Sequence, residues 1–76
     1  MIRIAICDDE LEVCAFLKNR IREVMQNEKV KSEIQTYQNG ELLLESHKKS
    51  HFDIIFLDLE MPVMNGFEIA KKLRNN

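Results

Sequence analysis

Hydrophobic residues follow two different spacings along this chain. Apolar runs within residues 2–7, 33–38 and 52–57 predict β-strands. Residues 11–27 and the segment after residue 65 repeat their apolar positions every three or four residues, and 41–45 consists of helix-forming residues. The predicted order of elements is therefore β-α-β-α-β-α.

The first predicted helix, residues 11–27, follows an acidic cluster. Its apolar face consists of Leu11, Cys14, Leu17, Ile21, Val24 and Met25. The carboxylate of Asp9 can accept hydrogen bonds from free N–H groups in the first turn, so we expect Asp9 to be the N-cap. Glu12, three positions later, completes a capping-box pattern.

The middle of the chain is less regular. Residues 33–38 alternate only loosely, which predicts a partly exposed edge strand. Asn39 precedes the helix-forming residues and is the expected N-cap of the second helix. His47 and His51 lie four positions apart in a polar segment that we interpret as a loop, so we expect solvated histidines rather than metal ligands.

The third predicted strand has the most continuous apolar run, residues 54–57. Such a run predicts burial on both faces in the middle of a parallel sheet. Asp53 precedes the run and is expected to lead into the strand, and Asp58 ends it.

A loop containing Pro62 connects this strand to the last helix. Asn65 is the expected N-cap, with Glu68 at the capping-box position. We expect Gly66 to serve the backbone conformation at this junction. The basic residues near the end of the helix are expected to be solvated charges that suit its C-terminal dipole: Lys71, Lys72 and Arg74.

Alternation of strands and helices predicts an α/β fold with a parallel sheet and right-handed crossovers. We expect the strand order 2-1-3, which begins a three-layer, flavodoxin-like fold. Ligands of such folds bind at the carboxyl ends of the strands, where the order reverses. Here that place falls between the first and third strands, and Asp8, Asp9 and Asp58 follow those strands.

Composition narrows the class of protein. A chain of 76 residues, 45% hydrophobic and 32% charged, has the make-up of one small globular domain. A net charge of −2 argues against binding nucleic acid through a basic surface. No apolar run is long enough for a membrane span, and the acids at 8–10 interrupt the N-terminal apolar stretch before a signal peptide could form, so we expect a cytoplasmic protein. Cys7 and Cys14 are expected to be buried and unpaired.

The three converging acids indicate a functional site, because their mutual repulsion must be offset. Two like charges about 4 Å apart repel by roughly 4 kcal/mol at an effective dielectric constant near 20. Either one carboxyl group is protonated or a divalent cation is bound. A site of oxygen ligands suits Mg²⁺, with Mn²⁺ as a substitute. A carboxylate beside such an ion can also attack phosphorus and form an aspartyl phosphate.

The sequence resembles the receiver domains of two-component response regulators, which have the CheY-like version of this fold. The resemblance rests on Asp8-Asp9 after the first strand and on DLEMPVMNG at 58–66 after the third. It implies that Asp58 accepts a phosphoryl group from a sensor histidine kinase. It also implies that Asp8, Asp9 and Asp58 hold Mg²⁺ together with the backbone carbonyl of Glu60. The third strand and its loop look like those of receivers that precede a LytTR-type DNA-binding domain, and DNA would be contacted only by that domain.

Only three of the family's five βα units have a counterpart here. The family's Ser or Thr after the fourth strand and Lys after the fifth bind phosphoryl oxygens and relay the switch, and both are unmatched. Lys71 and Lys72 are predicted to lie on a helix and cannot replace that lysine. We therefore expect residues 1–76 to be a truncated receiver that lacks the last two βα units and accepts phosphate weakly. It would be a signalling phosphoacceptor rather than an enzyme.

Two other interpretations stay open. Asp58 and Glu60 resemble the acid pair of a haloacid dehalogenase-like phosphatase, but Pro62 stands where that family has Thr or Val. The other interpretation is a structural fragment that dimerises. An uncovered third strand would present an open edge, through which copies could self-associate or exchange strands. We expect no membrane partner.

Overall fold

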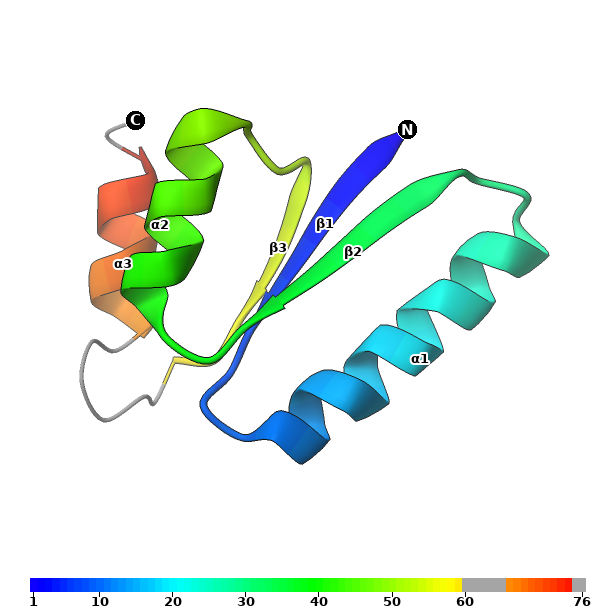
Figure 1. Ribbon diagram of the computed structural model, residues 1–76, viewed down its shortest axis with the longest axis horizontal. Coiled ribbons are helices and arrows are strands. Elements are labelled where there is room, and N and C mark those ends of the chain that lie inside the picture. The colour runs from blue at the N-terminus through cyan, green and yellow to red at the C-terminus, as the bar shows by residue number, and fades with distance from the viewer. Residues whose placement is uncertain (60–65, 75–76) are drawn as a thin grey trace.

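The three strands form one parallel sheet with helices on both faces. The computed structural model describes residues 1–59 and 66–74. Its elements are β1 (Ile2–Cys7), α1 (Leu11–Asn27), β2 (Ser32–Tyr37), α2 (Gly40–Lys49), β3 (Ile54–Leu57) and α3 (Gly66–Arg74). The strand order is β2-β1-β3, with α1 on one side of the sheet and α2 and α3 on the other (Figure 1). This confirms the predicted three-layer α/β fold and its strand order.

The core is centred on β1, because this strand pairs with both neighbours and has a helix layer over each face. Its residues from Ile4 to Cys7 are at most 1% exposed. On the side of α2 and α3, the buried cluster comprises Ala5, Cys7, Leu43, Leu44, Phe52 and Ile69. The sheet is therefore anchored by its middle strand, from which the acidic residues extend.

The start of α1 differs from the prediction. Glu10 occupies the N-cap position, and its side chain makes no capping hydrogen bond, so the assignment of Asp9 as the cap is wrong. Instead, the backbone N–H of Glu10 donates to Asp8 Oδ1 at 2.9 Å, and this turn carries the chain past Asp9 before the helix begins. The apolar face is covered in part: Cys14 is buried, whereas Leu11 is 67% exposed.

The second helix is longer than predicted. Asn39 is its N-cap, as expected, and accepts a hydrogen bond from Leu42 N–H through Oδ1 at 2.9 Å. The helix continues through His47, so the predicted polar loop at 47–51 is wrong in its first part. His47 is buried, whereas His51 is exposed as expected. A contact with Phe52 N–H, which the local sequence does not reveal, accounts for the burial of His47.

The third strand is shorter than predicted and begins at Ile54. Phe52, which the prediction included, lies in the buried core before the strand starts. Asp53 leads into the strand as expected: its N–H donates to Arg3 O, and its Oδ2 accepts from Arg3 N–H, both at 2.8 Å. Burial on both faces is wrong for β3, since Ile54 is 38% and Phe56 40% exposed. Within the described residues β3 pairs with β1 alone and is therefore an edge strand.

The last helix packs against α2. Ile69 is buried, and the basic residues of the last turns are exposed as predicted: Lys71, Lys72 and Arg74. The expected loop residue Pro62 and the expected cap Asn65 lie outside the described residues. Among the helices that the structure describes, none has the length and apolar character needed to cross a membrane.

Candidate metal and phosphoryl site

The acidic residues sit where two parallel strands end. Cys7 and Leu57 are register partners, so Asp8 and Asp58 leave the same edge of the sheet side by side. Asp8 N–H donates to Tyr37 O, and Asp58 N–H donates to Cys7 O, both at 3.0 Å. These bonds extend the strand pairing by one residue and fix both backbones beyond the last strand positions.

Three carboxylates converge at this edge. Asp8, Asp9 and Asp58 each offer one oxygen, and these oxygens all lie within 4.8 Å of one another. Asp8 and Asp58 are half-buried and Asp9 is exposed. The structure thus brings together the three acids that the sequence singled out. Glu60, the other candidate ligand, lies outside the described residues.

A hollow of about 230 Å³ lies against the cluster. Asp8 and Asp58 form its polar rim, and its apolar wall consists of Ile6, Cys7, Leu17, Phe56 and Leu57. Because the wall offers no charged partner, the polar atoms of a bound ligand would have to be met at the acidic rim.

The two cysteines beside the acids are buried and not joined in a disulfide, as predicted. Burial raises the pKa of the Cys7 thiol to about 11, and the Cys14 thiol and the carboxylates of Asp8 and Asp58 add to the effect. Burial also raises the pKa of Cys14, whose Sγ donates to Asp8 O at 3.4 Å. Only thiolates bind metals or act as nucleophiles, so neutral thiols leave this chemistry to the carboxylates.

Gly66 brings α3 against the site. Its N–H donates to Leu59 O at 3.2 Å, and a Cβ at this position would lie 2.4 Å from Asp58 O and 2.5 Å from Leu59 Cα. Gly66 does not have a positive φ, so the expectation that it serves a special backbone conformation is wrong. The position requires glycine because the backbone after β3 approaches too closely for any side chain.

The donor set decides which ion the site suits. Oxygen ligands from several carboxylates match hard cations such as Mg²⁺ or Mn²⁺, whereas zinc sites generally include histidine or cysteine. The nearby thiols are neutral, and neither histidine belongs to the cluster. The described residues therefore fit a hard divalent cation held by Asp8, Asp9 and Asp58.

Comparison with known proteins agrees with this geometry. Residues 4–76 match the model of the response regulator receiver domain. The chain belongs to the receiver domain family. Family membership decides against the haloacid dehalogenase interpretation of Asp58 and Glu60.

Individual relatives of the receiver are longer proteins. This receiver is 38% identical over 73 residues to a protein-glutamate methylesterase/protein-glutamine glutaminase of Bacillus licheniformis. The match covers 96% of this chain and 19% of that protein. It is 34% identical over 74 residues to the sensory transduction protein LytT of Oceanobacillus iheyensis, covering 97% of this chain and 28% of LytT. Its fold is similar to that of chemotaxis protein CheY4 of Vibrio cholerae, with a TM-score of 0.84 and 28% identity over 99% of this chain and 57% of the other.

Arg3 makes contacts in this receiver that the residue pattern did not predict. This residue is the only charged residue within the apolar segment 2–7, and a lone charge in such a run is a signal of a specific partner. The structure places the Arg3 guanidinium over the Phe52 ring, 4.3 Å from its centroid. Arg3 belongs to a network at the end of the sheet opposite the acids.

Proposed function

We propose that this receiver accepts a phosphoryl group on Asp58 from a histidine kinase or a histidine phosphotransfer protein. The observation that carries the proposal is the convergence of three carboxylate oxygens within 4.8 Å at the end of β1 and β3. Membership of the receiver family supports it, because receivers are signalling domains that work with such partners.

Each acid has a distinct part in the proposed transfer. A carboxylate oxygen of Asp58 attacks phosphorus, the bond from phosphorus to the donor nitrogen breaks, and an aspartyl phosphate forms. The hydrogen bond from Asp58 N–H to Cys7 O holds the nucleophile's backbone in place. Asp8, oriented by the N–H of Glu10, and Asp9 would hold Mg²⁺ with Asp58 and the backbone carbonyl of Glu60. When bound, Mg²⁺ supplies positive charge that offsets the charge of the transferring oxygens.

The output of the whole protein is part of the proposal. The chain spans less than a third of LytT and of the methylesterase relative, so we place this receiver in a longer cytoplasmic protein in which another domain gives the response. We propose a transcriptional output through a DNA-binding domain, consistent with the similarity to a sensory transduction protein. The match to the methylesterase covers 19% of that enzyme and gives no support for esterase activity in this chain.

Phosphoryl uptake from a small donor tests the function directly. Incubation with acetyl phosphate and Mg²⁺ should add one phosphoryl group, detected by mass spectrometry and removed by hydroxylamine, as expected for an acyl phosphate. Uptake should disappear with excess chelator, because without the cation the acids repel the incoming phosphate. Uptake that is independent of the metal, or an adduct that maps to a histidine, would contradict the proposed chemistry.

We also propose that the open edge of β3 allows self-association or strand exchange between copies of this chain. Ile54 and Phe56 are 38% and 40% exposed on one face of this strand, and pairing of two β3 edges would extend the sheet and shield these side chains in part. Sedimentation should show dimers at high concentration, and Phe56→Glu should shift the chain to monomers. Phe16→Glu, at a 65% exposed position on α1, is the matched control and should leave the dimer intact. Sedimentation as a monomer at every concentration would be evidence against this contact.

A further inference from the structure

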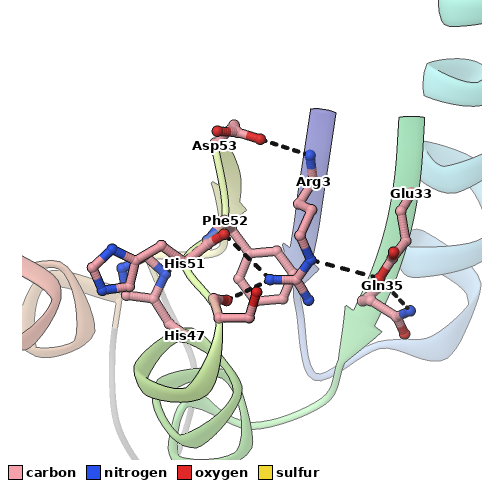
Figure 2. A network of polar contacts seen from close by, with 8 residues as sticks. Arg3, Glu33, Gln35, His47, His51, Phe52 and Asp53 are labelled. Carbon is pink, nitrogen blue, oxygen red and sulfur yellow. Dashed lines mark hydrogen bonds and ion pairs between the residues drawn. The ribbon is translucent and has the colours of Figure 1, made fainter. Parts of the chain in front are cut away.

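A second cluster of interacting side chains lies at the other end of the sheet, where β1 and β3 begin (Figure 2). It joins three parts of the fold. His47 comes from the last turn of α2, Phe52 and Asp53 precede β3, and Arg3 lies on β1. Its position separates this cluster from the proposed phosphoryl site, which lies at the carboxyl ends of the same two strands.

His47 makes the central contact of the cluster. Its Nδ1 accepts a hydrogen bond from Phe52 N–H at 3.1 Å, and the residue is only 9% exposed. An imidazole nitrogen can accept only when it carries no proton, so this bond requires a neutral ring with its proton on Nε2. Protonation of Nδ1 would break the bond and leave Phe52 N–H buried without this acceptor.

The bond fixes the connection between α2 and β3. Phe52 is part of the buried core and packs edge-on against Tyr37, with ring centroids 5.9 Å apart. The next residue, Asp53, pairs with the backbone of Arg3 and so sets where β3 begins. Because β3 spans only four residues and is followed by Asp58, this connection helps to position the strand that carries the proposed phosphoacceptor.

Nearby groups make a charge on His47 unfavourable. The His51 ring stacks on His47 with centroids 4.4 Å apart and planes 12° from parallel (Figure 2). Arg3 donates to Ser50 O and His51 O, which keeps its positive charge beside the connection. Burial, then His51 and then Arg3 lower the pKa of His47.

Charged residues on the neighbouring elements also surround His47. α3 runs in the same direction as α2 (Figure 1), so its last-turn cations lie toward the His47 end and Glu68 toward the other. Those cations are Lys71, Lys72 and Arg74, and α2 itself adds Lys48 and Lys49.

Of the nearby acids, Glu33 on β2 is 3.7 Å from Arg3, and Asp53 accepts from Arg3 N–H. Glu33 is therefore ion-paired with the Arg3 side chain, whereas Asp53 bonds to the backbone N–H of Arg3 and keeps its negative charge. The cations named above outnumber this one uncompensated acid.

We propose that His47 is a proton-controlled latch, whose neutral imidazole fixes the α2–β3 connection and whose protonation releases Phe52 N–H and loosens the start of β3. Near neutral pH the latch is closed. As the pH falls, the folded chain resists protonation at His47 while the unfolded chain does not, so stability decreases from about pH 7 toward pH 5. Each unit by which the pKa is lowered corresponds to about a tenfold change in the unfolding equilibrium constant.

Titration followed by NMR on this chain tests the latch without any substitution. The His47 ring signal should titrate below the ordinary pH range of a histidine, because its pKa is lowered by burial. Once the intrinsic pH dependence is removed, the protection factor of the Phe52 amide should fall about fivefold on protonation, the effect of losing one ordinary hydrogen bond. Titration of His47 at the ordinary pH of a histidine, or a Phe52 amide that stays fully protected after His47 is protonated, would overturn the proposal.

Two matched variants separate the latch from general acid sensitivity. In His47→Asn the side-chain oxygen can accept from Phe52 N–H but does not titrate, so the loss of stability between pH 7 and pH 5 should disappear. His51→Asn removes the other histidine and should retain most of the loss. An unchanged pH profile in His47→Asn would overturn the proposal. If this variant does not fold, the NMR titration of the unsubstituted chain decides.

Discussion

Asp58→Asn is expected to lower phosphoryl uptake by at least about a thousandfold. The uptake that remains would be below detection in most labelling assays. A carboxamide is similar in shape to a carboxylate but is a poor nucleophile toward phosphorus, and it carries no charge to help hold the cation. The hydrogen bond from residue 58 N–H to Cys7 O involves only backbone atoms and should persist. The measurement is incorporation of label from acetyl phosphate with Mg²⁺.

Asp53→Asn is the matched control, because Asp53 lies at the opposite end of β3 and its replacement can still accept from Arg3 N–H. We expect its uptake to equal that of the unsubstituted receiver. In the absence of metal, Asp58→Asn should also keep or raise the free energy of unfolding, since it removes one of three like charges within 4.8 Å. Persistent labelling of Asp58→Asn would rule out Asp58 as the acceptor.

Gly66→Ala is expected to lower the free energy of unfolding by about 1–3 kcal/mol and to slow phosphoryl uptake. The added Cβ would lie 2.4 Å from Asp58 O and 2.5 Å from Leu59 Cα, and both are backbone atoms. A flexible side chain could rotate away from such a clash, but here either α3 or the segment carrying Asp58 must shift. Urea denaturation measures the first effect, and labelling from acetyl phosphate measures the second.

Lys71→Ala provides a comparison on the same helix, because Lys71 is exposed. Its free energy of unfolding should stay within about 0.5 kcal/mol of the unsubstituted value. The result for Gly66→Ala also separates two explanations for the glycine. Alanine tolerates the φ at this position, so a marked loss must come from the lack of space. Stability and uptake that match those of the unsubstituted receiver would show that the close approach is not needed.

Some of the differences between expectation and structure have one origin. Asp9 is a residue type that often caps helices, but Glu10 N–H donates to Asp8 within the preceding turn. The N-cap position of α1 therefore falls one residue later, at Glu10. His47 lies in a polar segment typical of a loop, but it is buried in the last turn of α2, where it accepts a hydrogen bond from Phe52 N–H. In both cases, hydrogen bonding outside the helix altered an assignment made from residue preference.

The exposure of β3 and the role of Gly66 illustrate a second limit. An apolar run such as 54–57 shows that a strand favours burial, but neighbouring strands decide whether its outer face is covered. The need for glycine at position 66 depends on how closely α3 approaches the backbone of Asp58 and Leu59. Such an approach is a property of packing, and no spacing in the sequence expresses it.

The sequence by itself determined the alternation of strands and helices, the strand order and the three acids at the ends of β1 and β3. These features follow from periodicity and from the topology of parallel sheets, which depend on local residue patterns. Only the tertiary structure decided that His47 contacts Phe52, that Arg3 pairs with Asp53 fifty positions away, and that α3 leaves no room for a side chain at Gly66. Those contacts join residues from separate elements, so they exist only once the helices have packed on the sheet.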